Sequence, residues 1–164
     1  MTTNWMTPTA LDQYPEEGTE SAHVSWNTSF TGSVTNGTLV HIARKPKVDF
    51  TNKTFYLKAT GFNFDNLPET INGIELRLTA DRRGRVTDET IQLVLDNNPI
   101  GDNLASLELD EIKSYGGENV LWGTNITATD IMNPSFGVLM RFRAHPHYPH
   151  RDGIIIRAVE LLIH

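Results

Sequence analysis

The chain has 164 residues, of which 38% are hydrophobic and 21% charged, a balance typical of one folded domain with a sizeable core. It has no cysteine, which excludes disulfides, thiolate zinc sites and cysteine nucleophiles. The formal net charge is −6, so a phosphate backbone would repel the chain, and we expect no nucleic-acid partner.

The first ten residues lack both the basic run and the apolar run of a secretory signal. No apolar stretch reaches the roughly 20 residues that cross a bilayer. We therefore expect a chain that is made in a cytoplasm and has no membrane partner.

Residues 1–23 have no hydrophobic period, and a segment of this kind cannot build its own core. Two interpretations stay open for it. One is a frayed tail, and the other is an extended N-terminal arm whose large apolar residues dock on a neighbouring subunit. Those residues are Trp5, Met6, Leu11 and Tyr14.

From residue 24 onward, apolar and polar residues alternate with the two-residue period of half-buried strands. The stretches with this pattern are 38–44, 54–64, 71–80, 90–96, 137–144 and 154–164. Turn residues separate them, including Asn72-Gly73, which we expect at positive backbone angles, and a polar hairpin tip at 81–85. One helical turn is expected at 127–132. Short strands without long helices predict an all-β fold, an antiparallel β-sandwich of jelly-roll type over 24–164.

Several short motifs follow one another after residue 54. They include Phe62-Asn63-Phe64, Ile71-Asn72-Gly73-Ile74, Tyr115-Gly116-Gly117, Leu121-Trp122-Gly123, Asp130-Ile131 and Asn133-Pro134-Ser135-Phe136-Gly137-Val138. In this order they resemble a β-sandwich domain that is widespread in structural proteins of tailed bacteriophages, over about residues 54–164. The resemblance implies a virion protein, and it does not say which part of the virion, because one fold serves many functions. Within the motifs, Trp122 and Phe136 are expected in the core.

The first functional hypothesis is a capsid decoration (cement) protein, a trimer that binds the outside of the head through the major capsid protein or another virion protein. The arm and the domain rim would make the contacts, and neither an enzymatic activity nor a cofactor is expected. The alternative is a tail-associated module that binds a receptor or a carbohydrate through exposed aromatic side chains, for which Trp26, Tyr56, Tyr115 and Tyr148 are the candidates. A hydrolase ranks third, because no motif singles out a pair of acidic residues.

Two polar clusters are candidate sites. Arg82, Arg83 and Arg85 could pair with acidic groups of a partner, or they could form a solvated turn. The second cluster, His145, His147 and His150, could hold a transition metal. Two prolines stiffen that loop and no further ligand motif is visible, so a rigid exposed loop without metal is the favoured interpretation.

Overall fold

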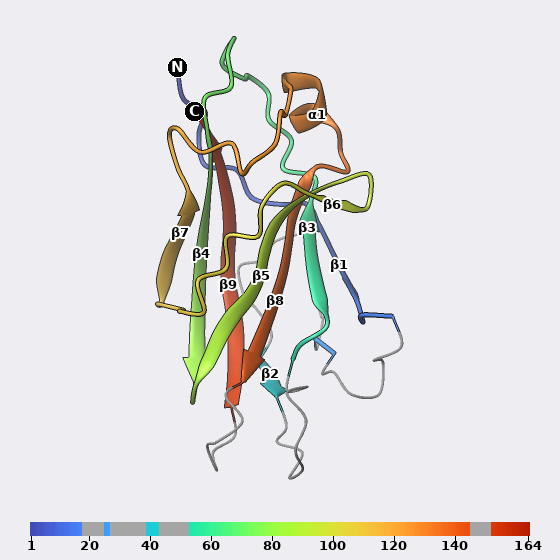
Figure 1. The fold of residues 1–164 in the computed structure, drawn as a ribbon, viewed down its shortest axis with the longest axis vertical. Helices are drawn as coiled ribbons and strands as arrows, with labels where there is room; N and C mark the ends of the chain where they lie inside the picture. The colour runs from blue at the N-terminus through green and yellow to red at the C-terminus, as the bar shows by residue number, and fades with distance from the viewer. Residues whose placement is uncertain (18–24, 27–38, 43–52, 145–151) are drawn as a thin grey trace.

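The computed structural model describes residues 1–17, 25–26, 39–42, 53–144 and 152–164. Within these ranges the chain is all-β with one short helix (Figure 1). None of the described residues belongs to a helix with the length and apolar character that crossing a bilayer requires. In chain order the elements are β1 (Ala10–Tyr14), β2 (Leu39–Ile42), β3 (Tyr56–Thr60), β4 (Ile74–Arg83), β5 (Val86–Leu95), β6 (Asn98–Ile100), β7 (Ile112–Gly116), α1 (Ala128–Met132), β8 (Gly137–Ala144) and β9 (Asp152–Ile163).

The strands form two antiparallel sheets (Figure 1). The five-stranded sheet has the order β1-β3-β8-β5-β6, and the four-stranded sheet has the order β2-β9-β4-β7. One hydrophobic cluster takes side chains from both sheets, for example Leu76 and Leu78 of β4 together with Met140 and Phe142 of β8. The predicted all-β architecture is therefore confirmed.

Each of the six stretches with a two-residue period contains a strand. In β4 the residues Ile74, Leu76 and Leu78 are fully buried, whereas Glu75 and Arg77 between them are partly exposed. This alternation places one face of the strand in the core and the other in solvent. Trp122 and Phe136 are also buried, as expected from the sequence.

The segment 81–85 is not a hairpin, contrary to expectation. Strand β4 pairs with β9 and β7, whereas β5 pairs with β8 and β6, so the chain crosses here from one sheet to the other. Gly84 makes the sharp change of direction with φ of 73°. We call this connection the β4–β5 corner.

A true hairpin joins β5 to β6. Asp96 and Asn97 both have positive φ, 49° and 64°, and Leu95 lies opposite Asn98. Two central residues at positive φ are the geometry of a two-residue loop that matches the twist of its strands.

The expectation for Asn72-Gly73 is wrong, because neither residue is among those with positive φ. Gly73 is required for a different reason. A Cβ atom built on Gly73 would lie 2.1 Å from the carbonyl oxygen of Gly117, so only glycine allows the two backbone segments to approach this closely.

Candidate functional site

The β4–β5 corner carries two of the three predicted rim arginines on an exposed surface. Arg82 and Arg85 are exposed, whereas the side chain of Arg83 lies outside the described part of the structure. A depression of about 550 Å³ is lined by Arg82, Arg85, Thr87, Leu107, Glu108, Leu109 and Asp110. A second depression, of about 420 Å³, is lined by Ala80, Asp81, Arg82, Asp110 and Glu111. We call the residues that line these two depressions the corner surface.

The apolar centre of the corner surface is Leu107, a residue that is 51% exposed. Its backbone has φ of 62°, in the left-handed region that L side chains rarely adopt. Such a conformation costs of order 1–3 kcal/mol and persists only where neighbouring contacts enforce it. An exposed leucine held in this way is a candidate contact residue, and no pattern in the sequence predicted it.

Neighbouring contacts hold Leu107 in place. Leu109 is buried, which anchors the segment in the core. The ammonium group of Lys113 donates to the hydroxyl of Ser106 and, at 2.6 Å, to the carbonyl oxygen of Glu108. The segment is therefore held at Ser106 on one side of Leu107 and at Glu108 and Leu109 on the other.

A buried carboxylate beneath this segment ties the two sheets together. Asp88 of β5 is fully buried and accepts hydrogen bonds from the hydroxyl of Tyr115 on β7 at 2.8 Å and from the backbone N–H of Ser106 at 3.2 Å. The ammonium nitrogen of Lys113 lies 3.7 Å from the same carboxylate. Burial and the charge of Asp88 raise the pKa of Tyr115, so its hydroxyl stays protonated and donates.

Asp88 was missed from the sequence because the predicted strand began at Thr90. Val86 and Asp88 pair with the core residues Ala144 and Phe142, whereas Thr90 pairs with Arg141 on the outer side, so the two-residue period of the predicted strand does not extend back to Asp88. The pairing register shifts between Asp88 and Thr90, which marks a β-bulge at this point. The other carboxylate oxygen, Oδ1, is buried and has no hydrogen-bond partner among the described residues.

Residues 1–17, which we call the N-terminal segment, pair with both sheets. The backbone N–H groups of Thr3 and Met6 donate to Ile163 and Leu161 of β9 at 2.9 and 2.8 Å. Farther along, β1 pairs with β3 and forms the edge of the five-stranded sheet. In this structure of one chain, the predicted arm is thus seated on its own domain.

The four predicted arm residues contact this domain. The guanidinium carbon of Arg77 lies 4.1 Å from the ring centroid of Trp5. The ring centroids of Tyr14 and Tyr56 lie 5.4 Å apart. Met6 and Leu11 pack against the hydrophobic cluster. All four side chains are only half-buried, and their predicted contact with a neighbouring subunit stays a prediction.

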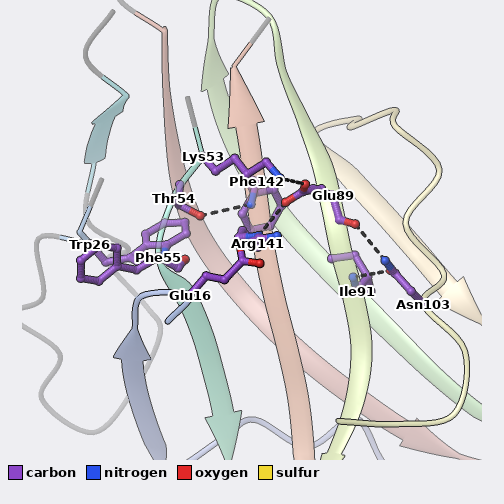
Figure 2. A network of polar contacts seen from close by, with 10 residues as sticks. All are labelled: Glu16, Trp26, Lys53, Thr54, Phe55, Glu89, Ile91, Asn103, Arg141 and Phe142. Carbon is purple, nitrogen blue, oxygen red and sulfur yellow. Dashed lines mark hydrogen bonds and ion pairs between the residues drawn. The ribbon is translucent and has the colours of Figure 1, made fainter. Parts of the chain in front are cut away.

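A polar cluster around Arg141 fastens the end of the N-terminal segment (Figure 2). Arg141 of β8 is 5% exposed, although it lies on the side of the strand opposite to the core residues Met140 and Phe142. Its guanidinium donates to Glu89 of β5 at 2.6 Å and to Glu16 at 2.7 Å. We call Glu16, Lys53, Tyr56, Glu89 and Arg141 the Arg141 cluster.

The charges of this cluster are closely matched. The ammonium nitrogen of Lys53 lies 2.5 Å from a carboxylate oxygen of Glu89. The guanidinium carbon of Arg141 lies 4.2 Å from the ring centroid of Tyr56. Burial opposes the charge of Arg141, but the hydrogen bond to Glu16 and the charge of Glu89 outweigh it and raise the pKa of Arg141. Asn103 fixes the backbone of Glu89 by donating to its carbonyl oxygen at 2.9 Å (Figure 2).

The described aromatic candidates for a carbohydrate site are not exposed. Trp26 is buried and donates its indole N–H to the carbonyl oxygen of Phe55 at 2.9 Å, and Tyr115 is buried beside Asp88. Tyr56 is half-buried in the Arg141 cluster. Tyr148 lies outside the described residues.

The three histidines proposed as metal candidates, His145, His147 and His150, also lie outside the described residues. Within the part of the chain that the structure describes, no group of histidine and acidic side chains is arranged to hold a metal ion. Comparison of the chain with protein-family models, curated proteins and solved structures finds no significant match.

Proposed function

We propose that this chain is a structural protein of a tailed-phage virion, a capsid decoration (cement) protein that binds the outside of the head. The proposal includes the finer fold assignment, in which the two sheets form a sandwich of jelly-roll type. It is supported by the order of the phage-like motifs and by the all-β architecture with a core shared between two sheets. The proposed partner is the major capsid protein.

The observation that carries the proposal is the corner surface. It combines an exposed, conformationally restrained leucine, Leu107, with the arginines Arg82 and Arg85 and with acidic side chains such as Asp110. An apolar contact surrounded by charged groups is the usual composition of a protein–protein interface. A modest contact of this kind, repeated over many sites of a shell, stabilises the shell by mass action.

The charged side chains on the outer faces of the two sheets are paired within the chain. On the four-stranded sheet, Arg77 makes two hydrogen bonds to Glu160, at 2.9 and 3.0 Å, and Arg157 lies 2.5 Å from Asp81. On the five-stranded sheet, the Arg141 cluster is partly covered by Glu16 of the N-terminal segment. These charged groups are matched within the chain, and Asp81 among them also lies on the corner surface, so the choice of the corner rests on the exposed Leu107.

The test is the binding of purified chain to heads of the encoding phage that have been prepared without it. We expect Arg82→Gln together with Arg85→Gln to weaken binding about tenfold, which corresponds to about 1.4 kcal/mol. Occupancy is measured by quantitative gel analysis of sedimented heads at a series of chain concentrations.

A matched control makes the same change of net charge at the other end of the molecule. Thr70→Glu and Asn125→Glu alter exposed residues of the β3–β4 connection and of the segment before α1, and both segments lie at the end opposite the corner (Figure 1). The control should bind as the unmodified chain does. Equal binding by the corner variant, or glycan binding without head binding, would contradict the proposal.

A further inference from the structure

The N-terminal segment lies at the edge of the five-stranded sheet, outside the core of the domain. Its strand β1 pairs with β3 alone, at the edge of the five-stranded sheet. Its large apolar side chains Trp5, Met6, Leu11 and Tyr14 are all half-buried, so none of them is a fully enclosed part of the core. The chain has no cysteine, so no disulfide fixes the segment in place.

Packing between the segment and the domain is also incomplete. A depression of about 240 Å³ is lined on one side by Met1, Thr2, Thr3, Asn4 and Met6 and on the other by Phe64, Asp65 and Asn66. The contacts that remain are main-chain hydrogen bonds, the pair between Glu16 and Arg141, and the packing of half-buried side chains. Main-chain pairing at a sheet edge can be made equally well by the same strand of another copy.

The surface that receives the segment is held together by contacts of its own. Strand β3 pairs with β8 over Leu57–Thr60, and β9 pairs with β4 along most of its length. Arg141 also has a partner outside the segment, because its guanidinium donates to Glu89 of β5. Trp26 is fixed in the domain by Phe55 and by an edge contact with the ring of Phe142.

We infer that the N-terminal segment is an exchangeable strand, which leaves its own domain and pairs with β3 and β9 of a neighbouring copy of this chain. The segment of a neighbouring copy fits this edge because all copies are identical. Each copy presents the same β3 edge, and the same Arg141, to the Glu16 of its neighbour. Gln13 would then exchange its two hydrogen bonds, at 2.7 and 2.9 Å, with the backbone of the neighbour's Trp26. The inference rests on the proposed function only for the place where exchange is used, a shell that holds many copies side by side; the pairing itself needs only two copies of the chain in solution.

Strand exchange can be trapped by disulfides. Because the chain has no native cysteine, only the introduced cysteines can form them. Asp12 of β1 lies directly opposite Lys58 of β3, and opposite residues in antiparallel strands have Cα atoms about 4.5–5.5 Å apart, within disulfide range. The double variant Asp12→Cys/Lys58→Cys is purified with reductant, oxidised and run on a non-reducing gel. Exchange predicts covalent dimers and larger multimers that collapse to monomer when reductant is added.

The control variant is Thr79→Cys/Ala158→Cys, which joins facing positions of β4 and β9 within one domain. It should give only a monomer with an internal disulfide. Monomer alone from the Asp12/Lys58 variant, absence of any disulfide in it, or equal multimers from the control would each overturn the inference.

A second measurement avoids placing two new cysteines in one chain. Equal amounts of Asp12→Cys and Lys58→Cys chains are unfolded together, refolded and oxidised, and exchange predicts a covalent heterodimer. Its absence would overturn the inference. No phage head is present in either experiment, so their failure is distinguishable from a failure of head binding.

Discussion

Arg141 illustrates why a charged side chain can be buried on the outer side of a sheet. Its guanidinium reaches two carboxylates and an aromatic ring, and the Arg141 cluster brings two basic and two acidic groups together. A buried charge of this kind adds little net stability compared with an apolar side chain. Removal of one partner, however, leaves the remaining charge uncompensated and is strongly destabilising.

The two acidic partners of Arg141 should therefore differ in importance. The side chain of Glu89 is 17% exposed and also pairs with Lys53, whereas that of Glu16 is 48% exposed. We expect Glu89→Gln to lower the free energy of unfolding by about 3 kcal/mol, as for a buried pair, and Glu16→Gln by about 1 kcal/mol or less, as for an exposed pair. Urea unfolding followed by tryptophan fluorescence measures both. A larger loss for Glu16→Gln than for Glu89→Gln would contradict the description of this cluster.

At the scale of single elements, α1 depends on an ionised side chain. Thr127 caps the helix by accepting from the backbone N–H of Asp130 at 3.2 Å, and the Asp130 carboxylate accepts from the backbone N–H of Thr127 at 2.9 Å. The hydrogen bonds from the hydroxyl and backbone of Thr127 lower the pKa of Asp130 below the usual value of an aspartate side chain. This reciprocal arrangement is a capping box.

The sign of the resulting pH dependence follows from that lowered pKa. The contribution of ionised Asp130 is fully present above the unfolded-state pKa, and it is lost as the pH falls through the lower folded-state pKa. We therefore expect the backbone amide resonances of residues 127–130 to shift in acid with a midpoint below the usual pKa of an aspartate side chain. Asp130→Asn should abolish this titration, and a midpoint above that usual pKa in the unmodified chain would contradict the capping geometry.

The sequence predicted the strands that bury one face and the edge strand β2, but it did not predict the edge strands β1, β6 and β7. Strands β4, β8 and β9 carry long runs of apolar residues on their core side, and that period is readable without a structure. Strands β1 and β7 lie at sheet edges and are mostly exposed or half-buried, so their residues carry little of this pattern. Periodicity also does not say which strand pairs with which, and for this reason the β4–β5 corner was mistaken for a hairpin.

The candidate sites were predictable to a similar degree. The exposed position of Arg82 and Arg85 follows from their place in a polar turn. The contacts of Arg141 and Asp88 depend on residues distant in sequence, 125 positions away for Glu16 and 27 for Tyr115, and no local pattern encodes such a pairing. Leu107 depends on the contacts of Lys113 and Leu109, which are likewise visible only in the fold.

In the molecule as a whole, the sheets are joined by more than their shared core. The N-terminal segment pairs with β9 of one sheet and β3 of the other, and the hydrogen bond from Tyr115 to Asp88 joins β7 to β5. This hydrogen bond lies next to the segment that carries Leu107, because the backbone N–H of Ser106 donates to the same carboxylate. A rigid support under an exposed contact residue reduces the ordering cost of binding.

The most direct test of the account is an electron cryomicroscopy reconstruction of heads to which the purified chain has been added. We predict density for the domain on the outer surface of the head, with the β4–β5 corner and Leu107 turned toward the capsid shell. Heads without added density, or a domain attached through the end that carries α1, would contradict it.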